Sequence, residues 1–502
     1  MLKKVLIANR GEIAMRVARG CREFGVASVA VFSDPDAGAP HVRTADEAFP
    51  LGGLTPAESY LRGDAIIEIA RRVGADAVHP GYGFLAENPE FAGACAEAGL
   101  KFVGPTPDAM RALGSKTAAR KRMQAAGVPV VPGTVDPIPT AEQAAKIALE
   151  IGYPIALKAV SGGGGKGMRV VERPEDIETS FRQASSEAQA SFGDAAMYLE
   201  RLVVRPRHVE VQILADEHRN AVHLGERECS IQRRHQKLVE ESPSPVVDAD
   251  LRARMGEVAV RAAQAVGYTN AGTCEFLLDS DGSFYFLEVN ARLQVEHPVT
   301  ELVTGIDLVR EQLRVASGEP LGYGQDAIVQ RGHAIECRIQ AEDAANLFFP
   351  STGRVVAVHE PSGPGIRIDG ALEAGQAVTP YYDPMLAKLI VWAETRDAAV
   401  KRMRRALGEY LVLGVKTTIP FHRWLMEHPA FVAGDMDTGF LERHWTPSAA
   451  VPDDLAELAA LVAVVAAHRS RATIRPAAQA NGADGTEDRW LSFARRSGLR
   501  VP

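Results

Sequence analysis

The chain has 502 residues, of which 46% are hydrophobic and 24% are charged, and its formal net charge is -8. This length accommodates two to four domains with substantial hydrophobic cores, and the composition is that of an ordinary globular protein. The negative charge argues against nucleic acid as the main partner. We find no apolar run near the roughly 18 residues that a membrane-spanning helix needs.

The N-terminus and the cysteines predict a cytoplasmic protein. Only four apolar residues lie between Lys4 and Asn9, too few for a signal peptide. The five cysteines are odd in number, far apart and without a Cys-x-x-Cys pair. We therefore expect reduced, mostly buried thiols.

Residues 1 to about 113 alternate short β-branched runs with helical apolar spacing, which predicts an open parallel α/β sheet. The turn at Asn9–Glu12 lacks the GxGxxG pattern, which argues against a nicotinamide-binding domain. A glycine-punctuated loop, His79 to Asn88, follows one predicted strand. It is either a ligand loop or a tight turn with Tyr82 as a lid over the core.

A glycine-rich stretch, Ser161 to Met168, lies between two predicted strands, and Lys158 ends the first of them. Dense glycine exposes backbone N–H groups, which suits a loop that closes over phosphates. The stretch is not a P-loop, because Met168 stands where a P-loop has a hydroxyl residue. A flexible linker is the alternative, but the direct continuation into a strand at Arg169–Val171 favours the phosphate loop.

The run from Phe284 to Pro298 alternates with a strand's period of two: one face is mostly apolar and the other becomes progressively ionic. Ser280–Ser283 predicts a hairpin turn to the preceding strand. The expected pairs are Asp279 with Phe284, Leu277 with Phe286, and Glu275 with Glu288. Two bare carboxylates about 5 Å apart repel, whereas Mg²⁺ would bridge Glu275, Glu288 and the Asn290 amide oxygen. A polar outer face on an edge hairpin explains the pattern equally well.

Two further polar stretches suit ligand binding. His208, Glu210 and Gln212 share one face of a predicted strand, which fits nucleotide contacts or simple solvent exposure. Glu226–Lys237 is the most basic stretch, but neighbouring glutamates make a nucleic-acid surface improbable and leave a small oxyanion or an ion-paired surface. Residues 331 to about 445 read as a mixed α+β domain.

The chain resembles the biotin carboxylase family, the ATP-grasp enzymes that form one half of acyl-CoA and pyruvate carboxylases. The resemblance covers residues 1 to about 445. It rests on Ile7–Ala14, His79–Asn88, Gly162–Met168, Gln232–Lys237, Glu288–Pro298, Arg331–Arg338 and Tyr381–Met385. It implies an N-terminal α/β domain (1–113), an ATP-grasp domain (114–330) with a mobile lid (about 131–203), a C-terminal biotin carboxylase domain (331–445), and a helix with a flexible tail (446–502).

The resemblance implies a cofactor set of ATP with Mg²⁺ or Mn²⁺, and biotin as substrate. The metal ligands would be Glu275, Glu288 and Asn290. The ATP-binding residues would be Lys116, Lys158, Gly162, Gly163, Gly164, Gly165, Gly167, Met168, Glu200, Val203, His208, Gln232, His235 and Leu277.

The same resemblance implies that ATP and bicarbonate form carboxyphosphate, which breaks down beside biotin. Glu296 would be the base, and bicarbonate would bind Lys237, Arg292, Gln294, Val295 and Glu296. Arg338 would stabilise the biotin enolate, with Tyr82 against the biotin ring; the catalytic set is thus Lys237, Arg292, Glu296 and Arg338. Arg201, Lys166 and Ala291 replace residues frequent in the family, and none of the three changes threatens the assignment.

No Met-Lys-Met sequence occurs, so we expect the biotin-accepting lysine on a separate carrier protein. We further expect a homodimer and a carboxyltransferase subunit, within an acetyl-CoA or propionyl-CoA carboxylase complex. The alternatives are a two-subunit pyruvate carboxylase, another ATP-grasp carboxylate ligase, and a non-catalytic nucleotide-binding scaffold. The tail from Asp453 is either a disordered end or a segment that docks a partner protein, for which Trp490 and Phe493 argue.

Overall fold

The computed structural model of the chain describes residues 2–114, 116–134, 136–160 and 168–447. Backbone contacts divide the chain into two units, 1–450 and 451–502. The predicted helix and docking tail therefore lie outside the described residues from position 448 onward.

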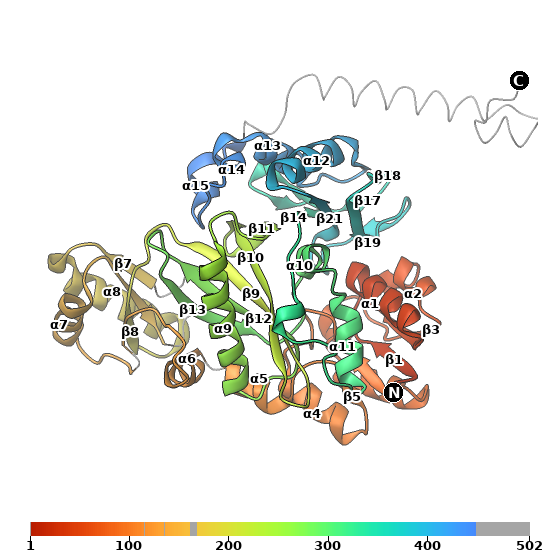
Figure 1. Ribbon diagram of the computed structural model, residues 1–502, viewed down its shortest axis with the longest axis horizontal. Coiled ribbons are helices and arrows are strands. Elements are labelled where there is room, and N and C mark those ends of the chain that lie inside the picture. Colours follow the sequence, from red (N-terminus) through yellow and green to blue (C-terminus); the bar gives the residue numbers. More distant parts are fainter. Residues whose placement is uncertain (1, 115, 135, 161–167, 448–502) are drawn as a thin grey trace, which may run out of the picture. The chain divides into compact units, whose positions relative to one another are not determined.

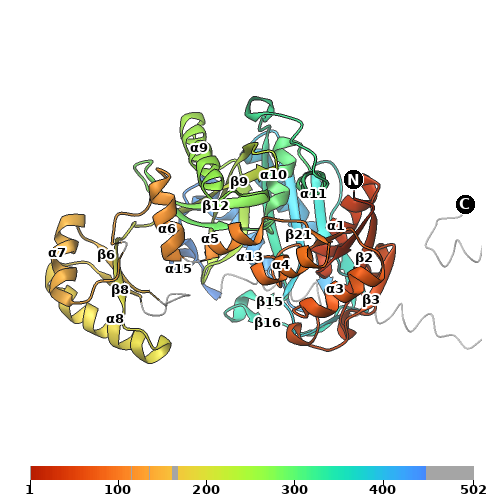
Figure 2. The ribbon, with the colours of Figure 1, turned by 90° about the horizontal axis from the view of Figure 1, so that it is seen from below.

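The N-terminal region forms a parallel five-stranded sheet in the order β3-β2-β1-β4-β5, which confirms the predicted open α/β sheet. Alternate residues of β1 enter opposite cores: Leu6 packs with residues of α3 and α4, and Ile7 packs with residues of α1. Helices thus cover both faces (Figure 2). The elements are β1 (Lys4–Ile7), α1 (Gly11–Phe24), β2 (Ala27–Phe32), α2 (Pro40–Thr44), β3 (Glu47–Pro50), α3 (Gly63–Arg72), β4 (Ala77–His79), α4 (Pro89–Glu97), β5 (Lys101–Phe102) and α5 (Pro107–Gly114).

The predicted lid region contains a small three-stranded sheet, order β7-β6-β8, with a hydrophobic core of its own. Two helices pack on it and contribute small residues such as Ala144 and Ala184. This core is separate from the hydrophobic clusters of the rest of the described chain. Its elements are α7 (Ala141–Ile151), β6 (Ile155–Ala159), β7 (Met168–Val171), α8 (Ile177–Phe192) and β8 (Met197–Arg201).

The largest sheet has eight antiparallel strands in the order β13-β12-β9-β10-β11-β14-β21-β19, and it runs without a break across the predicted boundary at residue 330 (Figure 1). Its neighbouring pair β11 and β14 joins the two predicted domains. The strands are β9 (Arg207–Ala215), β10 (Ala221–Arg233), β11 (Gln236–Ser242), β12 (Asn270–Leu278), β13 (Phe284–Asn290), β14 (His333–Gln340), β19 (Ile366–Gly370) and β21 (Met385–Ala393).

Helices pack on both halves of this sheet. Helix α9 packs on β9 and β10, and α12 packs on β14 and β21. The mixed fold class predicted from the sequence is therefore confirmed, with the two halves fused through one sheet. The helices are α6 (Lys116–Ala125), α9 (Ala249–Ala265), α10 (His297–Thr304), α11 (Leu308–Ala316), α12 (Arg396–Glu409), α13 (Ile419–Glu427), α14 (Pro429–Val432) and α15 (Phe440–His444). Short strands complete the C-terminal part: β15 (Glu342–Asp343), β16 (Phe349–Pro350), β17 (Gly353–Arg354), β18 (Ala357–His359), β20 (Ala377–Val378) and β22 (Leu411–Leu413).

Candidate active site

The β12–β13 hairpin places Glu275 directly opposite Glu288, as the sequence predicted. The other two predicted pairs are wrong, because Leu277 faces Tyr285 and Leu278 faces Phe284. A register shift between Glu275 and Phe276 accounts for the difference. Next to the turn, the strand pairing is displaced by one residue from the predicted pairing. A β-bulge then restores the predicted pairing at Glu275 and Glu288.

The predicted alternation ends at Asn290, where β13 stops. Residues 291–296 form an irregular loop of bends and a final turn instead, and Glu296 is the N-cap residue of α10. The expected ionic strand face is therefore wrong beyond Asn290. This loop carries Arg292, Gln294 and Glu296. The Glu87 carboxylate helps to fix its shape, because it accepts a hydrogen bond of 2.9 Å from the Ala291 N–H.

Lys237, on β11, lies among three carboxylates. Its Nζ is 2.5 Å from Glu210 Oε2, 2.9 Å from Glu275 Oε1 and 2.6 Å from Glu296 Oε1. Burial alone lowers the pKa of Lys237, but the three anions outweigh burial and hold the pKa well above its usual value. The ammonium is therefore charged, and it links the predicted metal-binding hairpin to Glu296.

Glu296 lies between two cations. Arg338, on β14, donates to Glu296 Oε2 at 2.9 Å, while Lys237 holds the other oxygen. Burial raises the pKa of Glu296, but Lys237, Arg338 and Arg227 more than offset burial and hold that pKa well below its usual value. Glu296 is completely buried and ionised, so it is competent to accept a proton from a substrate that reaches it.

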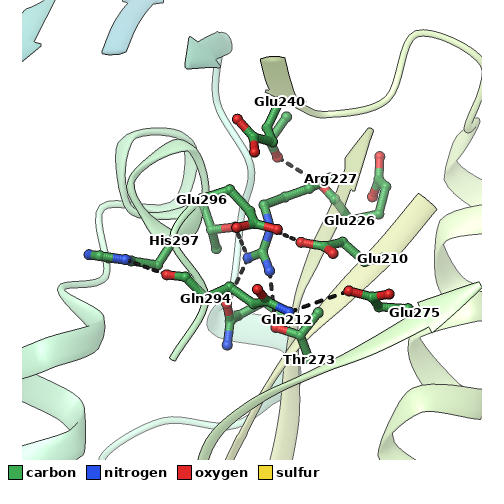
Figure 3. A network of polar contacts seen from close by, with 12 residues as sticks. Glu210, Gln212, Glu226, Arg227, Glu240, Thr273, Glu275, Gln294, Glu296 and His297 are labelled. Atoms are coloured by element: carbon green, nitrogen blue, oxygen red, sulfur yellow. Dashed lines mark hydrogen bonds and ion pairs between the residues drawn. The ribbon is translucent and has the colours of Figure 1, made fainter. Parts of the chain in front are cut away.

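Arg227, on β10, is a fully buried residue that the sequence prediction missed. It donates to Glu210 at 2.6 Å, to Gln212 at 2.6 Å and to Thr273 at 3.0 Å (Figure 3). Of the two interpretations of the β9 polar face, this pairing excludes solvent exposure, because Glu210 and Gln212 are 0% exposed. The sequence signal for this pairing was the alternation of polar residues on β9. The sequence alone could not show that the polar face is buried or that Arg227 is its partner.

Arg292 does not contact Lys237 or Glu296 in the described structure. Its Nε donates to Glu87 Oε2 at 2.9 Å, and its terminal nitrogens donate to Gln294 at 2.9 Å and to Asn290 at 3.1 Å. The guanidinium is thus tied to the hairpin end and to the His79–Asn88 loop.

One cavity of about 1370 Å³ lies beside these groups. Its lining includes Lys237, Arg292, Gln294, Val295 and Arg338, together with Tyr82 and the hairpin residues Glu275, Glu288 and Asn290. Tyr82, which the sequence left as either a ligand contact or a core lid, lines the cavity with its backbone carbonyl held by Asn9. A space of this size suits a nucleotide and a second substrate together.

Profiles of known families match almost the whole described chain. The biotin carboxylase N-terminal domain matches residues 1–110, the ATP binding domain of the carbamoyl-phosphate synthase L chain matches 115–323, and the biotin carboxylase C-terminal domain matches 336–443. The chain belongs to the biotin carboxylase family. It is an ATP-grasp ligase that carboxylates biotin, with ATP and Mg²⁺ as its cofactors.

Individual relatives agree. Biotin carboxylase from a Nostoc species is 52% identical over 439 residues, covering 88% of this chain and 98% of that protein. A pyruvate carboxylase subunit from Methanothermobacter thermautotrophicus is 51% identical over 444 residues, covering 88% and 90%. The crystal structure of a biotin carboxylase–ATP complex from Campylobacter jejuni has 47% identity and a TM-score of 0.82, covering 88% of this chain and 99% of that one.

Elsewhere along the cavity of this biotin carboxylase, Glu200 on β8 pairs with two cationic side chains. Lys158 Nζ is 2.6 Å from Glu200 Oε2, and Arg120 donates to the other oxygen. Arg120 was not predicted, and it comes from α6, a helix whose polar residues gave no distinguishing signal. The cavity is also lined by the predicted residues Met168, Val203, His208, Gln232, His235 and Leu277. Gly162, Gly163, Gly164, Gly165, Gly167 and the side chain of Lys116 lie outside the described part of the chain.

The hairpin residues fit a magnesium ion. Glu275 and Glu288 face each other, and their carboxylates are the hard oxygen ligands that Mg²⁺ prefers. The Asn290 Nδ2 donates to Glu275 Oε1 at 2.9 Å, which holds the amide beside the two carboxylates. The ligand atoms of His208, Glu210 and Glu275 also lie within 4.8 Å of one another. His208 Nε2 is 3.1 Å from Glu275, and although burial lowers the pKa of His208, Glu275 raises it above its usual value.

Proposed function

We propose that this biotin carboxylase carries out the first half-reaction of an acetyl-CoA or propionyl-CoA carboxylase complex. It acts on biotin held by a separate carrier protein and supplies a separate carboxyltransferase subunit. The separate carrier protein is part of this proposal. A homodimer is supported by a related structure, the dimeric biotin carboxylase domain of Hydrogenobacter thermophilus 2-oxoglutarate carboxylase, at 47% identity.

We place the enzyme in the cytoplasm, since its five cysteines are buried free thiols. Among the residues that the structure describes, no helix is long and apolar enough to cross a membrane. The domain boundaries at 113, 330 and 445, with a lid over about 131–203, are part of the same proposal.

The observation that carries the chemistry is Glu296 held between Lys237 and Arg338, because both of these cations line the cavity and keep the Glu296 carboxylate ionised beside it. Glu296 accepts the bicarbonate proton while a bicarbonate oxygen attacks the γ-phosphorus of ATP and ADP leaves. The product, carboxyphosphate, then breaks its C–O bond to give CO₂ and phosphate. The ureido nitrogen of biotin gives its proton to the released phosphate and forms the new N–C bond to CO₂.

Bicarbonate binding uses Lys237, Arg292, Gln294 and the backbone at Val295. The planar guanidinium of Arg292 matches a planar oxyanion. The Val295 carbonyl accepts from the buried Lys388 at 2.9 Å, which fixes the backbone of the loop next to Glu296. This anchoring keeps the anion site in place before substrate arrives.

The ATP phosphates are bound by Lys116, Lys158 and the glycine loop, and Glu200, Val203, Met168, His208, Gln232, His235 and Leu277 contact the rest of the nucleotide. Glu275, Glu288 and Asn290 would hold Mg²⁺, which neutralises phosphate charge when bound. Arg338 stabilises the negative charge that develops on the biotin ureido oxygen, and Tyr82 contacts the ring.

The test is ADP release with Mg²⁺ and bicarbonate, with and without free biotin. We expect biotin to stimulate the wild-type enzyme and Glu296→Gln to abolish the stimulation, since Gln cannot accept the proton. The control is Glu319→Gln, whose carboxylate is partly exposed and paired only at 3.9 Å. Biotin-independent turnover that survives in Glu296→Gln would instead indicate another ATP-grasp ligase.

A two-subunit pyruvate carboxylase is the second candidate, favoured by the 51% identity to the pyruvate carboxylase subunit from Methanothermobacter thermautotrophicus. The final acceptor is chosen by the carboxyltransferase. Purifying the intact complex and supplying acetyl-CoA, propionyl-CoA or pyruvate in turn, with radiolabelled bicarbonate, distinguishes the two candidates by which acceptor becomes labelled.

A further inference from the structure

Two buried carboxylates face each other beside Arg338. Glu240 on β11 pairs directly with Glu336 on β14, and both side chains are 0% exposed. Directly opposed residues of an antiparallel ladder share one face, with Cβ atoms about 5 Å apart. Arg338 lies two residues beyond Glu336 on the same strand and therefore on the same face.

The hydrogen bonding of the two carboxylates is incomplete. Arg338 Nε donates to Glu240 Oε1 at 2.6 Å, but Glu240 Oε2 receives no hydrogen bond from any described residue. Neither oxygen of Glu336 has a donor within the described chain. A buried, ionised carboxylate without hydrogen-bond donors lowers the stability of the fold by several kcal/mol, whereas a protonated carboxyl group can donate a hydrogen bond to a neighbouring carboxylate.

Lys388, a cation near Glu336, contacts other acceptors. Lys388 Nζ, on the adjacent strand β21, donates to the Val295 carbonyl and lies 3.3 Å from Glu12 and 3.7 Å from Asp369. It is opposite Arg338 in the ladder and not opposite Glu336. Lys388 thus contributes positive potential but no hydrogen bond to Glu336.

Arg338 is divided between two anions. Its guanidinium contacts Glu240 at 2.5 Å and Glu296 at 2.9 Å; these two carboxylates are labelled in Figure 3. Four charged groups act on Glu336: Glu240, Arg338, Lys388 and Glu296. Burial, with the Glu240 and Glu296 charges, raises the pKa of Glu336 well above its usual value despite the opposing effect of Lys388 and Arg338. Burial and Glu296 likewise raise the pKa of Glu240, to about 7, against the effect of Arg338.

We propose that Glu240 and Glu336 hold one proton between them, with Glu336 as the donor to Glu240 Oε2, and that this acid pair positions Arg338 for biotin. The shared proton reduces the negative charge on Glu240. More of the positive charge on Arg338 is then available to the anion that develops on biotin. The effect on biotin rests on the proposed function, whereas the shared proton does not. Both glutamates are positioning residues, because they act through Arg338.

Infrared spectroscopy of the substrate-free enzyme tests the proton directly. A protonated carboxyl group gives a carbonyl stretch at higher frequency than the amide bands. We expect the wild-type minus Glu336→Gln difference spectrum at neutral pH to contain this band. The matched control is Glu241→Gln, one residue along β11, because Glu241 is equally buried but ionised: burial raises its pKa, yet His333 and Arg396 lower the value to about 2. A difference band present for Glu241→Gln and absent for Glu336→Gln overturns the proposal.

Kinetics test the role in positioning. A raised pKa means that the proton is present at neutral pH and lost as pH rises through the folded-state value, so wild-type biotin-dependent activity should fall on the alkaline side. Glu336→Gln cannot ionise and still donates to Glu240, so it should retain activity at higher pH. Glu336→Val should raise the KM for biotin about tenfold, with the KM for ATP unchanged. Identical pH profiles and KM values in the Gln and Val variants overturn the positioning role. Absence of biotin stimulation in the wild type refutes the proposed function, while the infrared result still decides whether the pair holds a proton.

Discussion

Replacing Lys237 with methionine removes the cation that three carboxylates share. Methionine keeps the length and apolar stem of the side chain but leaves Glu210, Glu275 and Glu296 buried beside one another. Removing one partner of a buried ion pair costs about 3–5 kcal/mol. Because Lys237 is at most 10% exposed and contacts all three anions, we expect the loss in the free energy of unfolding to lie in that range at neutral pH.

The loss should shrink at lower pH. In the wild type, Lys237 helps to hold the pKa of Glu275 and Glu296 below the usual value, so the pairs stabilise the fold above the unfolded-state pKa and that stability is lost as pH falls. In Lys237→Met the same buried carboxylates lose the cation that they share, so their folded-state pKa rises and protonation relieves the repulsion between them. The difference between the two proteins should therefore be smaller in mildly acidic buffer than at neutral pH.

Urea unfolding followed by circular dichroism under both conditions measures the difference. Lys401→Met is the control, since this lysine is 68% exposed and pairs only with Asp397 on the same helix; we expect less than about 1 kcal/mol for it. A loss for Lys237→Met no larger than that of the control, or one that is independent of pH, would refute the reasoning.

Three further outcomes are expected. Arg338→Lys should lower biotin-dependent kcat by about 100-fold with little change in the KM for ATP, because an ammonium cannot hold both carboxylates and the biotin oxygen; an unchanged kcat would contradict this. Glu87→Ala should raise the KM for bicarbonate about tenfold by freeing Arg292, whereas Glu90→Ala, which loses only a 3.7 Å surface pair, should not; equal KM values would count against the role of Glu87. A thiol reagent should label none of the five buried cysteines in the native enzyme and all of them after denaturation. The reason is that burial raises the pKa of the thiols, for Cys95 to about 12, and the thiolate is the reactive form. Rapid labelling of the native enzyme would show that the thiols are accessible.

Local patterns in the sequence were enough to predict most elements and the carboxylate hairpin. Alternation with period two and a polar turn predict that Glu275 and Glu288 lie opposite each other, because hairpin pairing is local. The same patterns missed the bulge beside Glu275 and the end of β13 at Asn290, since both depend on contacts made by other elements. The predicted α/β rhythm of the N-terminal region was also correct, because each strand and helix carries its own apolar period.

Which charges meet depends on long-range contacts that only the folded chain reveals. Glu87 reaches Arg292 across 205 positions of the chain, and Arg338 reaches Glu240 across 98. The second contact follows from the strand order β11-β14, which one sequence does not specify. Polar alternation looks the same on a solvated strand and on a buried one, so the burial of Arg227 and of Glu336 became evident only once each strand had its neighbours in the sheet.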